Sequence, residues 1–355
     1  MELIQKLKEF TTVSIIGMDK NVGKTTTLNH LIKETRGKLT LGLTSIGRDG
    51  EDTDRVTFTP KPRIYVESGS ILATSKECLL KGDTTLEILK TTGIHTPMGE
   101  VIIARCLSDG YVELGGPSRN TDISHVCEEM KSLGCDLVMV DGALSRKTLA
   151  SPAITEATVL ATGATISRSM PTAVEKTAHT YQLLSTPIVE DEKLRELSRQ
   201  LILKHKVSII DSEYKSRTVH TMTALEASKE VSEALQEDSQ YLVIQGILGD
   251  KFVDELIKYT NLYKQLTFIV QDGTKLFLNR ENLMKLNKSG AQIRTLDQIN
   301  IIGLTANPTS PQGYSFDSFK FRSRLKEALG IPIYDVLGGE WHEIFRWRTE
   351  GTNRL

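Results

Sequence analysis

Short apolar runs alternate along the chain with segments in which apolar residues recur at helical spacing. The first run lies at 13–17, and apolar residues at 28, 31 and 32 follow it. Further runs at 39–47, 136–142 and 157–163 indicate buried strands, and patterns over 121–134 and from Pro171 indicate helices. Strands that alternate with helices predict an α/β fold with a mostly parallel, doubly wound sheet.

Between residues 60 and 117 the pattern changes to paired apolar runs around turn residues. Ser68-Gly69 separates one pair of runs, and Asp109-Gly110 separates another. Glycine in a short turn between two apolar runs favours a hairpin. We therefore expect a β-hairpin insertion over 60–117.

The second half of the chain has a different organisation. Residues 187–240 are mainly charged and helical in pattern, apart from the run VSIID at 207–211, and the strand–helix alternation resumes at Tyr241. We predict a first domain over 1–186 that contains the insertion, a mainly helical connector over 187–240, and a C-terminal α/β domain over 241–355. The pattern leaves open whether the last part instead extends the first sheet.

Composition and charge narrow the classes of function. The 355 residues are 39% hydrophobic and 25% charged, and 44 basic and 45 acidic side chains give a net charge of −1. This balance gives no general attraction to nucleic acid or to an anionic membrane, and we expect neither as a partner. No signal peptide or membrane span is indicated. The four cysteines form no Cys-x-x-Cys pair and the seven histidines are scattered, which predicts reduced core cysteines, no zinc site and a cytoplasmic protein.

The segment between the first strand and the first helix has the composition of a phosphate-binding loop. Free N–H groups and the helix dipole favour anions there, Lys24 can reach terminal phosphates, and the Thr25 hydroxyl can ligate Mg²⁺. Gly17 and Gly23 enclose five residues, where the usual pattern has four. We expect ATP and Mg²⁺ to be bound by loop residues Gly17, Asp19, Lys20, Asn21, Val22, Gly23, Lys24, Thr25 and Thr26.

Two acidic residues follow other predicted strands. Carboxyl ends of parallel strands meet at one edge of a sheet, so Asp141, which ends the run 137–140, should lie near the loop. A carboxylate there holds Mg²⁺ or orients an attacking water, although Asp141 is also a suitable helix cap or turn residue. Asp49 offers the same chemistry from the second strand, or lies in a solvated turn. With Lys24, these two are the predicted catalytic residues, and with Thr25 they are the predicted metal ligands.

Arginines and an asparagine complete the predicted site. Arg48, Arg146 and Arg168 follow three strand ends and together would form a cationic mouth for phosphate, whereas each alone is equally a surface or ion-pair residue. The sequence has no Asn-Lys-x-Asp guanine motif, which favours ATP over GTP. Asn307-Pro308, after the run INIIGLTA, is either an adenine contact or a loop that closes a strand.

Several blocks of the sequence resemble known proteins. The loop spacing resembles that of dethiobiotin synthetase and its ATP-binding relatives. Over roughly residues 5–190, the blocks IIGMDKNVGKTTTLN, GLTSIGRDGE, VELGGPSRNTD, VMVDGALSRKTLASP and ATVLATGATISRSMPTAVEKTAHTYQLLS resemble the ATPase subunit of the reactivating factor of lysine 5,6-aminomutase. That aminomutase is a radical enzyme that uses adenosylcobalamin and pyridoxal phosphate.

The resemblance implies a function and a set of partners. It implies ATP-driven removal of damaged cobalamin from the aminomutase, together with a second ATPase subunit that looks like a mismatch-repair ATPase. It also implies that the loop Gly17–Thr25 binds phosphate and Mg²⁺ and that Asp141 completes the metal shell. The four residues Arg48, Asp49, Arg146 and Arg168 would line the mouth of the site.

Three functions therefore remain in competition. The first is a remodelling ATPase whose β-rich insertion acts as a lever or docking surface. The second is an ATP-dependent ligase or kinase like dethiobiotin synthetase, although this chain has Ser45-Ile46-Gly47-Arg48 where that enzyme has a catalytic Lys-Pro. The third is a nucleotide-dependent metal or cofactor chaperone, for which a His- or Cys-rich tract is missing.

Overall fold

The computed structural model describes residues 2–46, 63–142, 151, 154–221, 223 and 227–335. It divides the chain into two compact units. Unit 1 combines Met1–Ala178 with Ile301–Leu355, and unit 2 is His179–Asn300. The chain therefore leaves unit 1, forms unit 2, and then returns.

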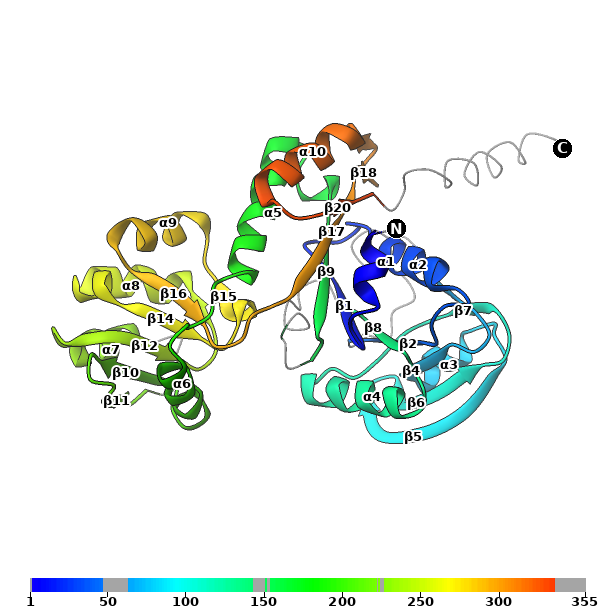
Figure 1. Cartoon of the computed structure of the whole chain (residues 1–355), viewed down its shortest axis with the longest axis horizontal. Helices are drawn as coiled ribbons and strands as arrows, with labels where there is room; N and C mark the ends of the chain where they lie inside the picture. The colour runs from blue at the N-terminus through cyan, green and yellow to red at the C-terminus, as the bar shows by residue number, and fades with distance from the viewer. Residues whose placement is uncertain are drawn as a thin grey trace. The chain divides into compact units, whose positions relative to one another are not determined.

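Unit 1 is built on a nine-stranded mixed sheet with β1 near its centre (Figure 1). Seven neighbouring strands are parallel, and β6 is antiparallel to both β4 and β5. This arrangement confirms the predicted α/β fold with a mostly parallel sheet. In spatial order the strands are β20 (Ile333–Tyr334), β17 (Ile301–Asn307), β9 (Ala157–Gly163), β1 (Thr12–Gly17), β8 (Leu137–Asp141), β2 (Leu41–Ser45), β4 (Ile71–Ser75), β6 (Gly99–Cys106) and β5 (Leu86–Thr96).

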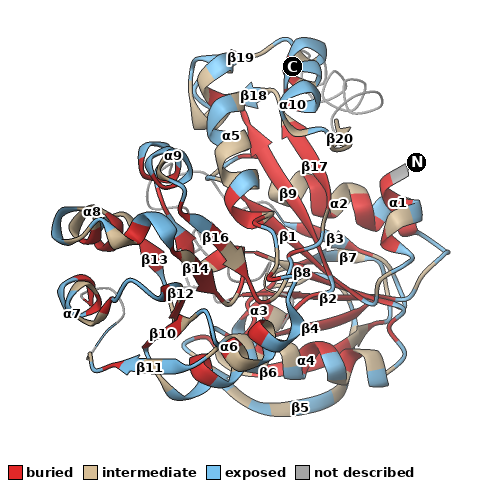
Figure 2. Ribbon diagram, turned by 60° about the vertical axis from the view of Figure 1, so that its left-hand side comes forward, coloured by how far each residue is buried: buried red, intermediate tan, exposed pale blue. Residues whose placement is uncertain are grey.

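Helices pack against this sheet through apolar side chains. Leu28 and Leu31 of α2 are fully buried and share a cluster with Val13 and Ile15 of β1. The central strands are accordingly buried along their length (Figure 2). The helices of unit 1 are α1 (Glu2–Leu7), α2 (Lys24–Thr35), α3 (Lys76–Leu80), α4 (Asn120–Ser132), α5 (Met170–Leu184) and α10 (Ser318–Leu329), and η2 (Ala164–Ile166) is a short 3₁₀ helix. Helix α5 continues into unit 2.

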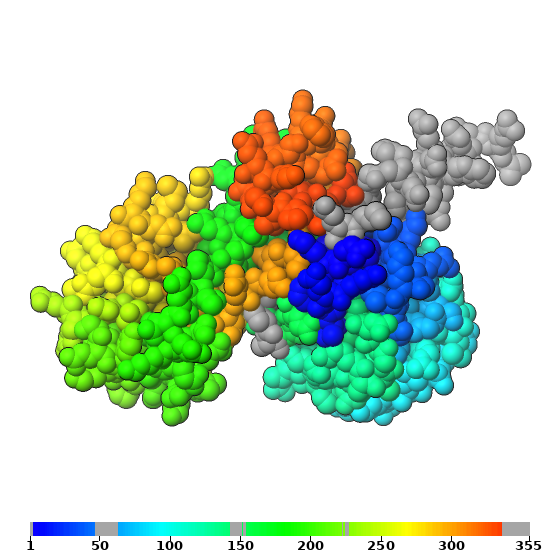
Figure 3. Space-filling view, in the orientation of Figure 1, coloured from blue at the N-terminus to red at the C-terminus, as the bar shows by residue number. Residues whose placement is uncertain are grey.

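The two ends of unit 1 lie side by side although they are far apart in sequence. A Cβ added to Gly303 of β17 would lie 3.5 Å from Leu3 Cδ1 of α1. In the space-filling view, the dark-blue residues of α1 adjoin orange residues of the returning segment (Figure 3). Strands β17 and β20 of the segment 301–335 therefore belong to the first sheet, and this segment is part of unit 1 and not of a separate C-terminal domain.

The two predicted hairpins are wrong. The strands β3 (Ile64–Val66) and β7 (Gly110–Val112) pair with each other, across the whole segment between them. Strand β4 instead joins the main sheet beside β2 and β6, and the hairpin that does form is β5–β6. Strands β4, β5 and β6 thus extend the main sheet, while β3 and β7 form a separate two-stranded sheet, because strand order depends on distant partners that a turn residue does not reveal.

Unit 2 contains a five-stranded sheet. Its strand β10 is antiparallel to both neighbours, and β12, β14 and β16 are parallel. The sheet order is β11 (Ser216–Val219), β10 (Val207–Asp211), β12 (Ser239–Ile244), β14 (Thr267–Val270) and β16 (Gln292–Thr295). The helices are α6 (Glu192–Lys204), α7 (Ser228–Ala234), α8 (Asp250–Tyr259) and α9 (Arg280–Ser289).

Several small elements accompany these sheets. Unit 2 has the two-stranded pair β13 (Leu248–Gly249) and β15 (Leu276–Phe277), and the short helices η4 (Leu262–Gln265) and η5 (Gly273–Lys275). In unit 1, β18 (Thr309–Ser310) and β19 (Tyr314–Ser315) form a small antiparallel pair after β17.

The predicted division at 187–240 and 241–355 therefore differs from the structure. Residues 187–240 supply β10 and β11, two of the five strands of unit 2, and do not form a mainly helical connector. The sheet of unit 2 ends with β16, and β17 returns to unit 1. The apolar runs were located from the sequence, but a fully buried strand carries no mark of the sheet that it joins.

Two general expectations concern cysteines and membranes. All four cysteines are free and buried, and burial raises the pKa of the Cys127 and Cys135 thiols to about 12. The thiols of Cys127 and Cys135 are therefore protonated at neutral pH. Within the described part of the chain, no helix combines the length and apolar character needed to span a membrane.

Candidate functional site

The loop from Met18 to Gly23 connects β1 to α2 at the carboxyl edge of the unit 1 sheet. Asn21 and Gly23 have positive φ angles of 57° and 92°, so the chain turns through the left-handed region twice. A Cβ on Gly17 would lie 2.6 Å from Lys24 Cδ, which explains the glycine there. The α2 N-terminus has no side-chain cap, so its N–H groups remain suited to an anionic ligand.

Lys24, the first residue of α2, turns back across the end of the sheet. Its Nζ donates a hydrogen bond to Gly142 O at 2.8 Å, directly after β8. Burial lowers the pKa of Lys24, although the charges of Asp141 and Asp19 oppose this shift. The ammonium group therefore lies where it could bind an anionic ligand in addition to interacting with the Asp141 and Asp19 carboxylates.

Asp141 ends β8 between the ends of two neighbouring strands, where its Cα partners are Ile15 and Ser45. Its Oδ1 is buried and has no hydrogen-bond partner among the described residues. Burial raises the pKa of Asp141 to about 6, and the nearby Lys24 charge limits that rise. A buried carboxylate oxygen without a donor is costly, and a hard cation is the ligand that would satisfy it. The predicted pairing of Lys24 with Asp141 at one edge is thus present in the structure.

The fit of this edge to Mg²⁺ depends on few protein ligands. No group of three or more His, Cys, Asp or Glu side chains among the described residues could hold a metal ion. Mg²⁺ commonly takes one or two protein oxygens and completes its shell with water and substrate phosphates. Asp141, together with the partly buried Thr25 in the first turn of α2, offers such a set.

Ser45 and Gly116 also lie at this edge of the sheet, although neither was predicted as a site residue. Ser45 lies beside Asp141 in register, and its Oγ accepts a hydrogen bond from Gly116 N at 3.3 Å. A Cβ on Gly116 would lie 1.9 Å from Ser45 O, so only glycine fits there. The Gly115-Gly116 pair in the block VELGGPSRNTD was the available signal, because paired glycines mark a close backbone approach.

Asn307 lies at the same edge but contacts the loop. Its Nδ2 donates to Asn21 O at 3.2 Å, and its Oδ1 accepts from Thr309 N at 3.1 Å. It therefore ties the end of β17 to the loop between β1 and α2. The adenine contact stays a prediction.

The remaining predicted residues differ in what the structure shows. Arg168 follows η2, after β9, and its guanidinium lies 5.7 Å from the centre of the Tyr314 ring. The Tyr314 hydroxyl donates to Ala164 O at 2.7 Å, so Arg168 has an aromatic partner within this segment. In the loop, Asp19 Oδ1 accepts from Lys20 N at 2.7 Å. Arg48, Asp49 and Arg146 lie outside the described residues.

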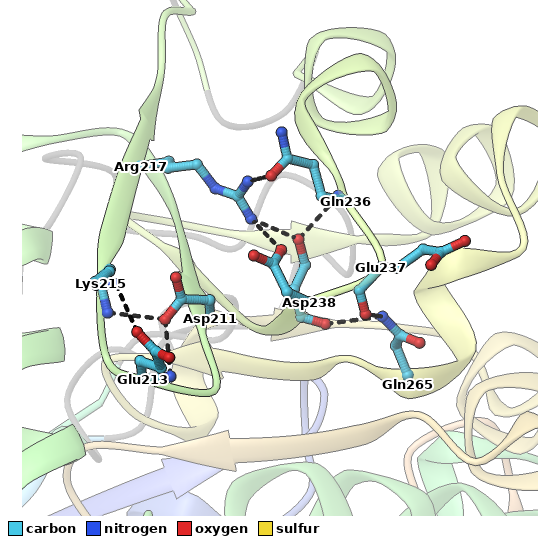
Figure 4. A network of polar contacts seen from close by, with 9 residues as sticks. Asp211, Glu213, Lys215, Arg217, Gln236, Glu237, Asp238 and Gln265 are labelled. Carbon is cyan, nitrogen blue, oxygen red and sulfur yellow. Dashed lines mark hydrogen bonds and ion pairs between the residues drawn. The ribbon is translucent and has the colours of Figure 1, made fainter.

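Unit 2 has a polar network of its own (Figure 4). Arg217 donates to Gln236, to Asp238 at 2.8 Å and to Ser239 at 3.0 Å, and Gln265 donates to the carbonyls of Glu237 and Ser239. A hollow of about 380 Å³ lies beside it. Its lining includes Tyr241 and Thr267, at the amino-terminal ends of β12 and β14, whereas open parallel sheets bind ligands at the carboxyl ends. The network is therefore best read as a structural tie between strand ends.

Comparison with models of known protein families gives no match to this chain, and comparison with curated proteins gives none either. The site therefore has to be interpreted from its own residues.

Proposed function

We propose that unit 1 is a P-loop nucleoside triphosphatase that binds and hydrolyses Mg-ATP at the carboxyl edge of its sheet. The observation that carries this proposal is the meeting of Lys24 with Asp141 and Gly142, more than a hundred residues apart, beside an uncapped helix N-terminus. A cation, a carboxylate with an orphan oxygen and free N–H groups are complementary to a metal–phosphate ligand.

Each residue has a distinct task in this proposal. The loop N–H groups and Lys24 hold phosphate oxygens, and the Thr25 hydroxyl and Asp141 carboxylate hold Mg²⁺. Bound Mg²⁺ supplies positive charge against the charge that develops on the transferred phosphoryl group. Asp141 is ionised above its pKa of about 6, so the carboxylate form needed for this task predominates at neutral pH. Partial burial of the pair lowers the local exposure to water and so strengthens these interactions.

We further propose that this ATPase remodels a protein client in the cytoplasm. The sequence blocks that resemble a reactivating factor support a client of one class, an adenosylcobalamin-dependent aminomutase, and a second mismatch-repair-like ATPase subunit as partner. Ser45 stands where a dethiobiotin synthetase-like ligase would begin its catalytic Lys-Pro segment, and its hydroxyl binds Gly116 N. This favours remodelling over small-molecule ligation.

Nucleotide binding is tested by thermal denaturation with and without Mg-ATP. A ligand at 100 times its dissociation constant stabilises the folded state by about 2.7 kcal/mol. We expect Lys24→Ala to abolish the rise in melting temperature caused by Mg-ATP. Lys275→Ala, in the turn of unit 2, should retain that rise. The absence of a shift in the unsubstituted protein with ATP, GTP or unhydrolysed analogues would reject the proposal.

Remodelling is tested by the absorbance of cobalamin released from the inactivated aminomutase. We expect release only when ATP, this chain and the second subunit are present together, because hydrolysis must be coupled to differential binding of two client states. Lys24→Ala is the control for this coupling. Cobalamin release that does not depend on ATP, or no cobalamin release although nucleotide binds, would contradict remodelling. Either result would favour a ligase or a cofactor chaperone instead.

A further inference from the structure

Asn307 meets the phosphate loop at its most unusual backbone position. Asn21 and Tyr214 are the two non-glycine residues with positive φ in the described chain, and Asn307 Nδ2 binds the Asn21 carbonyl at 3.2 Å. The other end of the amide is fixed, since Oδ1 accepts from Thr309 N. A side chain held at both ends can keep Asn21 in the left-handed conformation that shapes the loop.

Close packing joins the same two segments. A Cβ on Gly23 would lie 3.2 Å from Asn307 Cβ, and a Cβ on Gly163 would lie 2.9 Å from Asn307 O and 3.3 Å from Val22 Cα. The loop, the end of β9 and the end of β17 therefore share one tightly filled region. A shift of the loop requires an adjustment of Asn307, because no space separates them.

Buried threonine pairs extend these ties to both chain segments that lead to unit 2. Thr27 of α2 and Thr305 of β17 are hydrogen-bonded at 2.9 Å, and Thr162 of β9 and Thr177 of α5 at 2.7 Å. All four side chains are buried. Strand β17 begins at Ile301, directly after unit 2, and α5 runs into unit 2 at His179.

We propose that Asn307 is a positioning residue for the phosphate loop and that, with the Thr27–Thr305 pair, it links nucleotide binding to β17 and hence to unit 2. This inference rests on the proposed nucleotide site. The route is contiguous: the ligand fixes the loop, the loop fixes Asn21 and Asn307, and β17 carries the change to the point where the chain leaves unit 2. Because such coupling is reciprocal, a client bound to unit 2 would alter nucleotide affinity by the same factor.

The experiment is hydrogen exchange of the full chain with and without a saturating, unhydrolysed Mg-ATP analogue, combined with titration of its affinity. In the unsubstituted protein we expect nucleotide-dependent protection of 13–35 and also of 301–307 and 170–184. Asn307→Ala should weaken analogue binding at least tenfold and, at saturation, remove the protection of 301–307. Thr309→Ala is the matched control, because it retains the backbone N–H that donates a hydrogen bond to Asn307 Oδ1. Its analogue affinity and its protection of 301–307 should match those of the unsubstituted protein.

A second variant separates coupling from folding. Thr27→Val combined with Thr305→Val replaces both buried hydroxyls by methyl groups, so neither is left without a partner. We expect protection of the loop to persist while protection of 301–307 falls. A purely structural role would change exchange equally with and without nucleotide, which contradicts the inference.

The possible failures are distinguishable. If the unsubstituted protein shows no protection of 13–35, the proposed nucleotide site itself fails. If it binds the analogue but Asn307→Ala binds within twofold and protects 301–307 equally, the nucleotide site stands and the inference is overturned. If Asn307→Ala does not fold, unchanged protection of 301–307 in the double valine variant overturns it as well.

Discussion

Two turns of similar composition, one in each unit, have opposite properties. In unit 1, β1 leads to Gly23-Lys24-Thr25, and in unit 2, β14 leads to Asp272, Gly273, Thr274 and Lys275. The first has left-handed glycine, no side-chain cap and a cation beside a buried carboxylate. In the second, the buried Asp272 carboxylate accepts two hydrogen bonds from Thr274, one from the backbone N–H at 2.8 Å and one from the hydroxyl at 2.5 Å.

The packing around the two glycines differs as well. A Cβ on Gly273 would lie 2.5 Å from Leu183 O and 2.6 Å from Leu184 O, so the turn of unit 2 is pressed against the chain of α5. The Thr274 N–H group in this turn already has an anionic partner in the protein, the carboxylate of Asp272. Glycine, lysine and threonine after a strand are therefore suited to an anion only when no internal carboxylate takes the donors and when the backbone leaves room, and of these two turns only that of unit 1 meets both conditions.

The largest expected effect tests whether the two units are separate cores. Phe268 of β14 is fully buried in the main cluster of unit 2, so Phe268→Ala should cost about 3–5 kcal/mol of unfolding free energy. Native-state hydrogen exchange should locate the loss in 179–300 and leave the central strands β1, β8 and β9 protected. Equal loss of protection in those strands would contradict the division into units.

Asp272→Ala sharpens the comparison between the turns. It removes the carboxylate that accepts two hydrogen bonds, and loss of such a cap should cost about 1–2 kcal/mol. Chemical denaturation of the full chain measures this change. Asp272→Asn, which retains an acceptor oxygen, is the conservative control. If Asp272→Ala is as stable as the unsubstituted protein, the cap does not stabilise this turn.

Asp141→Asn tests the acidic partner of the open turn. The substitution preserves shape and removes charge, so hydrolysis should fall at least tenfold, equivalent to about 1.4 kcal/mol of barrier, while some nucleotide affinity remains. Phosphate release at saturating Mg-ATP is the measurement. Unchanged turnover would reduce Asp141 to a structural residue.

The smallest effect concerns pH. Partial burial tends to raise the pKa of Glu156, but hydrogen bonds from Thr11 N at 2.7 Å and Thr11 Oγ1 at 2.8 Å outweigh it, and the net pKa is lowered. A lowered folded-state pKa gives stability that is present above the unfolded pKa, about 4.3, and is lost as pH falls through the folded value. Because Glu156 is exposed, we expect only about 0.5 kcal/mol.

Denaturation curves between pH 5 and pH 3, an interval of about one unit either side of the carboxyl pKa, provide the measurement for Glu156→Gln. The variant should lose part of the acid dependence of stability and differ least from the unsubstituted protein at the acid end. A larger difference at acid pH would reverse the sign and reject this account.

Local patterns in the sequence were sufficient for several elements. The strands over 12–17, 41–45, 137–141 and 157–163 were predicted within about two residues at each end. The glycine-bearing loop between the first strand and helix was located as well, because a strand, a glycine loop and a helix opened by Lys24 are adjacent in the chain. These features depend on apolar spacing and on the conformational freedom of glycine, which are written in neighbouring residues.

Strand pairing and the contacts of the site were decided by tertiary structure. The sequence could not assign β17 to the first sheet, nor pair β3 with β7, because buried strands of either sheet share one apolar pattern. The contact between Asn307 and Asn21 spans 286 residues. The sequence by itself therefore determined the position of the loop and of several strands and helices, whereas burial of Asp141, its approach to Lys24 and the return of β17 to the loop required the folded chain, since each arises from packing between segments that are distant in sequence.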